Sequence, residues 1–207
     1  MEEVVRENKT MRNLYKIPAS GEWKIPVEAK DDGFPWLAIR IFTPRLKAVV
    51  EFFAQNEITY FFPVKYVDFE DRKGRIQHDL RPVVHNIIFI KKNVALKELK
   101  KVLEDCPYSL MVMKKEPERL EFYEISSKEM FEFMLMCNPE IELRKYISEE
   151  QALLKEGTEV EVHYGPLKGL TGKLVRQNKK YYLLKEVPGM GVMVKVSRWC
   201  CKPLKMD

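Results

Sequence analysis

The side chains of this chain best suited to nucleophilic or metal chemistry are three histidines and four cysteines. His78, His85 and His163 lie on three different predicted segments, so they lack the spacing of metal ligands. The cysteines are Cys106, Cys137, Cys200 and Cys201. They form no C-x-x-C pair, and the adjacent pair is a poor disulfide framework, which predicts reduced thiols. The sequence therefore predicts no metal site.

Other catalytic motifs are also absent from the sequence. No serine or cysteine stands in a nucleophile motif, and there is no Walker or G-x-G-x-x-G loop to hold phosphate. His85 beside Asn86 suggests a Cys-His-Asn site, but a histidine within an apolar strand is more often a structural residue. The carboxylates of three neighbouring glutamates are typical of surface charge: Glu116, Glu118 and Glu121. We therefore predict a protein that is not an enzyme and needs no cofactor.

Length and composition are those of a globular protein with one or two domains: 207 residues, 45% hydrophobic and 32% charged. No apolar run approaches the ~20 residues of a membrane span, and no signal peptide is visible, so we expect a cytoplasmic protein without membrane contact. The net charge of +5 is concentrated in residues 155–207, which hold eleven Lys or Arg against five Asp or Glu. This excess favours RNA or an acidic protein surface as a partner, although a solvated face produces the same excess.

Residues 157–176, GTEVEVHYGPLKGLTGKLVR, have the pattern of two strands joined by a glycine-rich turn. Two valines alternate with polar residues, which predicts a strand with one buried face. Gly165 and Pro166 then end that strand. Gly169 and Gly172 follow where a bent loop and a bulged strand start need positive φ or the close approach of another backbone.

The preceding stretch alternates between strand and helix patterns. Thr43 and Pro44 suit the start of a first helix, and Ser126 with Glu129 suits a capping box. Strands are predicted at residues 36–42, 58–67, 76–80, 83–90 and 110–113, and helices at 44–56, 95–104 and 127–137. Pro63 predicts an edge strand or a bulge. This order indicates an α+β domain with helices packed on one face of an antiparallel sheet.

Four segments follow from these patterns. Residues 1–33 form a polar N-terminal extension, partly disordered, that is expected to dock Trp23 on the body. Residues 34–140 form the α+β domain, and residues 141–154 form a charged linker without a clear strand pattern, with a continued helix as the alternative. Residues 155–207 form the basic C-terminal module.

The glycine-rich stretch resembles a known motif. Its pattern, G-x-x-V-x-V-x-x-G-P-x-x-G-x-x-G-x-L-V, is similar to the KOW motif of NusG-type transcription elongation factors and several ribosomal proteins. The resemblance implies a small SH3-like KOW β barrel at residues 155–207; the alternative is that the glycines serve the turns of another small barrel. The motif residues are Gly165, Pro166, Gly169 and Gly172.

Residues 34–140 resemble the NGN domain, which precedes KOW in the same family. Trp36 matches the aromatic residue that opens the first strand, and VVHNIIFI at residues 83–90 matches a segment like F-F-P-G-Y-V-F-V. The resemblance implies binding to the clamp helices of the RNA polymerase largest subunit through an apolar concavity. The residues that it assigns to polymerase are Trp36, Val84, Ile87 and Phe89. The alternative is that these side chains are core, because strand alternation sends half of them inward.

The VVHNIIFI segment departs from the family pattern. His85 and Asn86 replace the usual Pro-Gly, and Ile87 replaces an aromatic residue. Together with the polar extension, this resembles the UpxY-type antiterminators, specialised NusG paralogues that promote transcription of polysaccharide operons.

The resemblance also implies a nucleic-acid contact. It lies around the first strand-to-helix turn and on the predicted hairpin, where family members approach upstream or non-template DNA or nascent RNA. The candidate residues are Arg40, Arg45, Lys47, Lys65, Arg72, Lys73 and Arg75. Their attraction to phosphate is expected to be salt-sensitive. The alternative is that they are ordinary solvated charges.

The function expected from the sequence is therefore a monomeric, non-catalytic transcription elongation or antitermination factor. The NGN part is expected to bind RNA polymerase, and the KOW part, on a flexible tether, to recruit a ribosomal or termination protein. The alternative is a ribosome-associated RNA-binding protein that uses the basic KOW module.

Overall fold

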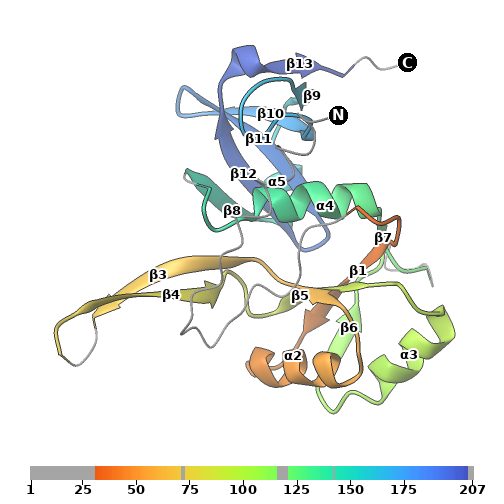
Figure 1. Ribbon diagram of the computed structural model, residues 1–207. Helices are drawn as coiled ribbons and strands as arrows, with labels where there is room; N and C mark the ends of the chain where they lie inside the picture. The colour runs from red at the N-terminus through yellow and green to blue at the C-terminus, as the bar shows by residue number, and fades with distance from the viewer. Residues whose placement is uncertain (1–30, 71–72, 116–120, 142, 205–207) are drawn as a thin grey trace, which may run out of the picture.

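The computed structural model describes residues 31–204 except 71–72, 116–120 and 142 (Figure 1). Most of the expected N-terminal extension, including Trp23, lies outside these residues, as does Arg72. The architecture is α+β with antiparallel sheets, as the sequence predicts. None of the described helices is long and apolar enough to cross a membrane.

The N-terminal sheet has the strand order β2-β5-β1-β6, and β7 also pairs with β1. Its strands are β1 (Trp36–Ile41), β2 (Tyr60–Phe61), β5 (Ile87–Lys91), β6 (Leu110–Val112) and β7 (Glu124–Ile125). Three helices accompany it: α2 (Leu46–Gln55), α3 (Leu96–Glu104) and α4 (Ser127–Met136). Thus the predicted order of strands and helices is confirmed, except that the sequence analysis did not predict β7.

Helices cover both faces of the N-terminal sheet, so the predicted packing on one face is wrong. Leu37 and Ile39 of β1 lie in one buried cluster with α2 and α3. Trp36 and Ala38, which alternate with them, lie in a second cluster with α4 (Figure 1). Both faces of β1 are apolar, and an apolar face must be covered by another element.

The predicted helix starts were correct at one site and wrong at another. The Ser126 hydroxyl accepts a hydrogen bond from the Glu129 N–H at 3.2 Å, which caps α4 as predicted. In contrast, α2 begins at Leu46, two residues beyond the predicted start. The Thr43 hydroxyl accepts from the Arg45 N–H at 3.2 Å, so it closes a turn before the helix.

A two-stranded hairpin, β3 (Val64–Glu70) and β4 (Ile76–Pro82), projects away from the sheet (Figure 1). The strand predicted at residues 58–67 is divided at Pro63, which has no N–H to donate to a ladder. The part before Pro63 is β2, an edge strand of the N-terminal sheet, and the part after it is β3. Residues 83–86 lie outside β5, so the strand predicted at 83–90 begins late.

The C-terminal sheet has six antiparallel strands in the order β13-β9-β10-β11-β12-β8. The strands are β8 (Arg144–Ser148), β9 (Thr158–Val162), β10 (Thr171–Gln177), β11 (Lys180–Val187), β12 (Met190–Val196) and β13 (Cys201–Pro203). Two short helices, α5 (Glu149–Leu153) and η2 (Arg198–Cys200), lie between strands in the chain. The alternation predicted in the glycine-rich stretch is confirmed, since Val160 and Val162 are buried.

Residues 141–154 were expected to form a linker, but they contain β8 and α5. Backbone pairing joins Tyr146 of β8 to Val192 of β12. The residues of β8 are only half-buried or exposed, which hid the strand pattern in the sequence. The Ser148 side chain and Gln151 then form a capping box for α5, whose Ala152 is fully buried. This segment is therefore part of the C-terminal structure.

The C-terminal sheet packs on α4, so the expectation of a flexible tether is also wrong. One continuous buried cluster includes Phe89 of the N-terminal sheet, Phe133 and Met130 of α4, and Leu183 and Val192 of the C-terminal sheet. Figure 1 shows α4 between the two sheets. Because α4 buries apolar side chains on two sides, it joins both parts of the chain.

Candidate functional site

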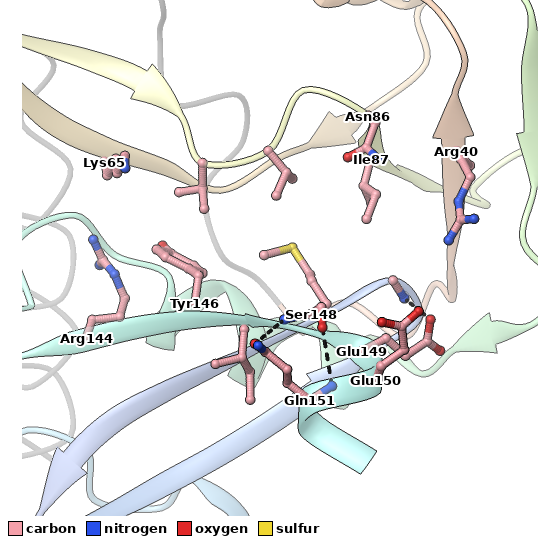
Figure 2. Close-up of a pocket in the computed structure, with 15 residues that line it drawn as sticks. Arg40, Lys65, Asn86, Ile87, Arg144, Tyr146, Ser148, Glu149, Glu150 and Gln151 are labelled. Atoms are coloured by element: carbon pink, nitrogen blue, oxygen red, sulfur yellow. Dashed lines mark hydrogen bonds between the residues drawn. The ribbon is translucent and has the colours of Figure 1, made fainter. Parts of the chain in front are cut away.

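A groove of about 700 Å³ separates the N-terminal sheet from the β8–α5 segment. We call it the central groove. Figure 2 shows Lys65, Asn86, Ile87 and Arg40 along one wall, and β8 and the start of α5 along the other. This groove includes two of the residues assigned to RNA polymerase, Val84 and Ile87, and two assigned to nucleic acid.

The charges of the central groove are mixed. Arg40 lies across the groove from Glu149 and Glu150 (Figure 2). Its Nε is buried and has no hydrogen-bond partner among the described residues. Glu149 accepts a hydrogen bond from the Gly189 N–H at 3.0 Å, so its carboxylate is held at the rim. Two carboxylates in the same groove would repel a phosphate that approached Arg40, so the groove is less favourable for nucleic acid than Arg40 alone would suggest.

Two residues assigned to RNA polymerase are buried in the cluster that includes α4. Trp36 is 1% exposed and Phe89 is 0% exposed. The rings of Phe89 and Phe133 of α4 are 5.5 Å apart in an edge-on arrangement. The Lys91 ammonium lies 5.3 Å above the Trp36 ring and 2.6 Å from the Asp32 carboxylate. In this conformation these side chains are core, the alternative that strand alternation left open.

The other two assigned residues differ from each other. Val84 is half-buried and lines the central groove. Ile87 is 4% exposed because the β11–β12 turn covers it. A Cβ added to Gly189 of that turn would lie 2.6 Å from Ile87 Cδ1. The absence of a side chain at Gly189 therefore permits the turn to approach Ile87 closely.

The basic residues assigned to nucleic acid are not brought together. Arg45 and Lys47 are exposed near the start of α2. Lys73 and Arg75 are exposed at the end of the projecting hairpin. Lys65 lies at the base of that hairpin, on the central groove. They do not form one continuous basic surface in the described structure.

The glycines of the KOW-like motif have the geometry that the sequence predicts. Gly165 and Gly169 have φ values of +89° and +87°, which disfavour any residue with a side chain. Gly172 is different, because a Cβ there would lie 2.5 Å from the Leu184 carbonyl oxygen of β11. Two glycines thus serve the turn, and the third permits close strand approach.

Sequence reasoning did not identify a polar contact between α4 and the C-terminal sheet. Glu132 is 2% exposed and accepts hydrogen bonds from the Lys185 ammonium and, at 2.8 Å, from the Thr171 hydroxyl. A charged residue between two phenylalanines of a helix, Phe131 and Phe133, was the available signal. A buried charge is normally paired, so this glutamate predicts a partner element packed on α4.

The reactive residue types considered in the sequence lie in separate parts of the described fold, except that the His163 backbone N–H donates a hydrogen bond to the Cys200 carbonyl at 2.7 Å. His78 is on the hairpin, where its Nδ1 lies 2.6 Å from the Asp68 carboxylate, and His163 follows β9. All four cysteines are free. Burial raises the pKa of the Cys137 thiol to about 12, so it is protonated at neutral pH and lacks the thiolate of a nucleophile.

Comparison with known proteins assigns no family to the chain, since no protein-family model matches it and no curated protein matches it either.

Proposed function

We propose that this chain is a non-catalytic transcription elongation or antitermination factor of the NusG type. Residues 34–140 would be its NGN domain and the C-terminal sheet an SH3-like KOW barrel. The observation that carries the proposal is the glycine-rich stretch. It has the spacing of the KOW motif, and its glycines adopt the required turn and close-approach geometry, behind an α+β sheet in the family's order.

The proposed polymerase contact is centred on Val84 at the central groove. A half-buried apolar residue that lines a concave surface is a suitable anchor for a partner helix. Ile87 would join this contact only if the β11–β12 turn moved away from it. Trp36 and Phe89 would not contact the polymerase directly. They would stabilise the sheet, since both are buried in the cluster that includes α4.

The proposed mechanism is a population shift. A protein that binds two parts of the polymerase clamp better in its closed state favours the elongating conformation and so suppresses pausing. The KOW part would recruit a further partner, such as a ribosomal or termination protein. The divergent segment at His85 and Asn86 supports a specialised factor, for example one acting on polysaccharide operons.

Co-purification tests the polymerase contact. The intact tagged chain, treated with nuclease, is expected to retain the RNA polymerase largest subunit. Val84→Asp should lose most of it, because a carboxylate in an apolar contact must be desolvated without a partner. Val94→Asp is the matched control: Val94 is 37% exposed and lies outside the residues that line the groove.

Ile87→Asp and Phe89→Asp are less suitable variants, because both side chains are buried and a carboxylate there would oppose folding. Recovery of ribosomal RNA alone, without polymerase, would contradict the proposal and favour the ribosome-associated alternative. Equal polymerase recovery by both valine variants would remove Val84 from the contact.

Nascent-transcript sequencing after deletion of the gene tests the specialisation. A specialised antiterminator should change elongation in one or a few long operons, because recruitment then depends on a local signal. A change across the whole genome would contradict specialisation and indicate a general factor.

A further inference from the structure

A second shallow groove, of about 680 Å³, lies on the C-terminal sheet. We call it the basic groove. It is built by the β10–β11 turn, the end of β12 and η2, and its lining includes Lys179, Lys180, Tyr181, Lys195, Arg198 and Trp199. In the β11–β12 ladder, Tyr181 pairs with Val196 at this end and Val187 pairs with Met190 at the other. The basic groove is therefore at the opposite end of that hairpin from the central groove (Figure 1).

Four cations line the basic groove, and no carboxylate does. Lys179, Lys180, Lys195 and Arg198 are all exposed, and none has an ion pair with an acidic side chain of the described chain. Unneutralised cations gathered in one concave surface create a positive potential. This surface is complementary to a row of phosphates.

A lysine in the β10–β11 turn has an unfavourable backbone conformation. Asn178 and Lys179 form the two-residue turn between β10 and β11, with φ values of +50° and +62°. Such turns favour glycine at the second position, because a side chain there is strained. A lysine therefore stands next to Lys180 at a position that favours glycine, and strain of this kind is typical of functional sites.

Two exposed aromatic side chains lie beside these cations. Trp199 is 75% exposed and Tyr164 is 57% exposed, and their ring centroids are 6.0 Å apart. Arg198 lies 5.9 Å from the centre of the Tyr181 ring. A large exposed apolar ring contributes little to folding, so an exposed indole within a basic surface indicates a partner that stacks on it.

We propose that the basic groove binds single-stranded nucleic acid. The four cations contact the phosphates, and Trp199, with Tyr164 beside it, provides a platform on which bases stack. An acidic polypeptide would use the cations but would gain little from the indole. A duplex would present phosphates but keep its bases stacked inside. The inference goes beyond the proposed function, because it requires no polymerase and uses none of the residues of the central groove.

Fluorescence anisotropy of labelled oligo(U) and oligo(dT) tests the proposal on the intact chain. A length of about 15 nucleotides is near the upper end of the sites known for single-strand-binding OB folds. Trp199→Ala is expected to weaken binding between about fivefold and about a hundredfold, the range measured for loss of base stacking. Since Trp199 is mostly exposed, the variant should keep the wild-type circular dichroism spectrum.

Salt dependence tests the phosphate contacts separately. Neutralising four phosphates of a single strand predicts a slope of about −3 for log affinity against log salt concentration. Lys180→Gln with Arg198→Gln should make this slope shallower by about 1.4. Lys97→Gln with Lys101→Gln, two exposed lysines of α3, removes the same charge from the N-terminal part and should leave both slope and affinity nearly unchanged.

Tighter binding of oligo(U) than of oligo(dT) would identify RNA as the ligand, and the reverse would identify DNA. The proposal would be overturned by no binding at about 50 mM salt, where phosphate contacts are strong, or by wild-type affinity of Trp199→Ala. Equal binding of a duplex would also overturn it. So would competition by poly-glutamate as effective as competition by the unlabelled oligonucleotide. The last result would assign the groove to an acidic protein. Each outcome is independent of polymerase co-purification, so the two proposals fail separately.

Discussion

At Gly172 the chain has no room for a side chain. A Cβ there would lie 2.5 Å from the Leu184 carbonyl oxygen, a backbone atom of the paired strand that cannot rotate away. The Gly172→Ala substitution is therefore expected to lower the free energy of unfolding by about 3 kcal/mol, the upper range for overpacking. Urea unfolding followed by circular dichroism measures this change.

Gly165→Ala is the matched control for that substitution. Gly165 has a φ of +89° but open space around its missing Cβ. Only the conformational strain remains, which costs about 1 kcal/mol. Equal effects of the two substitutions would show that the strand contact is not closely packed.

Tyr66 is the residue whose titration reports on the hairpin. Its hydroxyl donates a hydrogen bond to the Glu140 carboxylate at 2.7 Å, which ties β3 to the segment after α4. Burial, followed by the hydrogen bond and charge of Glu140, raises the pKa of Tyr66 to about 12. The folded state therefore holds this proton more tightly than the unfolded state does, whose pKa is about 10.

The stability that Tyr66 contributes is thus present below pH 10 and is lost as the pH rises towards 12. Absorbance at the tyrosinate band should show a step with a pKa of about 12 that is absent from Tyr66→Phe. Tyr164→Phe, which removes an exposed tyrosine, should retain that step. Persistence of the step in Tyr66→Phe would assign it to another tyrosine.

At the scale of elements, the pairing of β8 with β12 distinguishes a structured connection between the N-terminal and C-terminal sheets from a flexible linker. Arg144 and Lys145 lie in a strand paired with β12, and the Arg144 guanidinium also donates to the Asn138 carbonyl. A protease must extend and detach its target segment, so trypsin should cut the native chain slowly after these two residues. Mass spectrometry of the fragments measures the order of cleavage.

The β10–β11 turn supplies the internal comparison for this proteolysis. Lys179 and Lys180 are exposed at that turn and should be cut earlier than β8. Rapid cleavage at Lys145 would contradict the strand and support the flexible linker that the sequence pattern suggested.

At the scale of the whole molecule, the contact between α4 and the C-terminal sheet contains a buried ion pair. The side chains of Glu132 and Lys185 are 3% and 14% exposed. Removing the cation leaves the Glu132 carboxylate buried without its partner, so Lys185→Ala should lower the free energy of unfolding by about 3 kcal/mol. Tryptophan fluorescence during urea unfolding follows this change, because unfolding exposes the buried Trp36.

Lys173→Ala provides the control, because the pair of Lys173 with Glu186 is more exposed, at 23% and 39%. A pair on the surface contributes at most about 1 kcal/mol. If the two alanine variants unfold at the same urea concentration, the contact on α4 does not stabilise the assembly of the two parts.

The sequence by itself determined the elements whose signals are local. The Ser126 cap, the helical periods and the positive φ of Gly169 depend on neighbours within a few residues, and all were predicted. The basic groove was foreseen only as an excess of charge in residues 155–207. Its lysines, Arg198 and Trp199 come from separate turns that meet only in the folded sheet.

Only the tertiary structure decided which apolar faces are covered. The alternation along β1 predicted that Trp36 and Leu37 point to opposite faces, but not that helices pack on both. Likewise β8 has little pattern of its own, because its residues are only half-buried or exposed, and its strand pairing is with β12, which is remote in the chain. Periodicity specifies the direction of a side chain, whereas its exposure depends on the distant segment that packs against it.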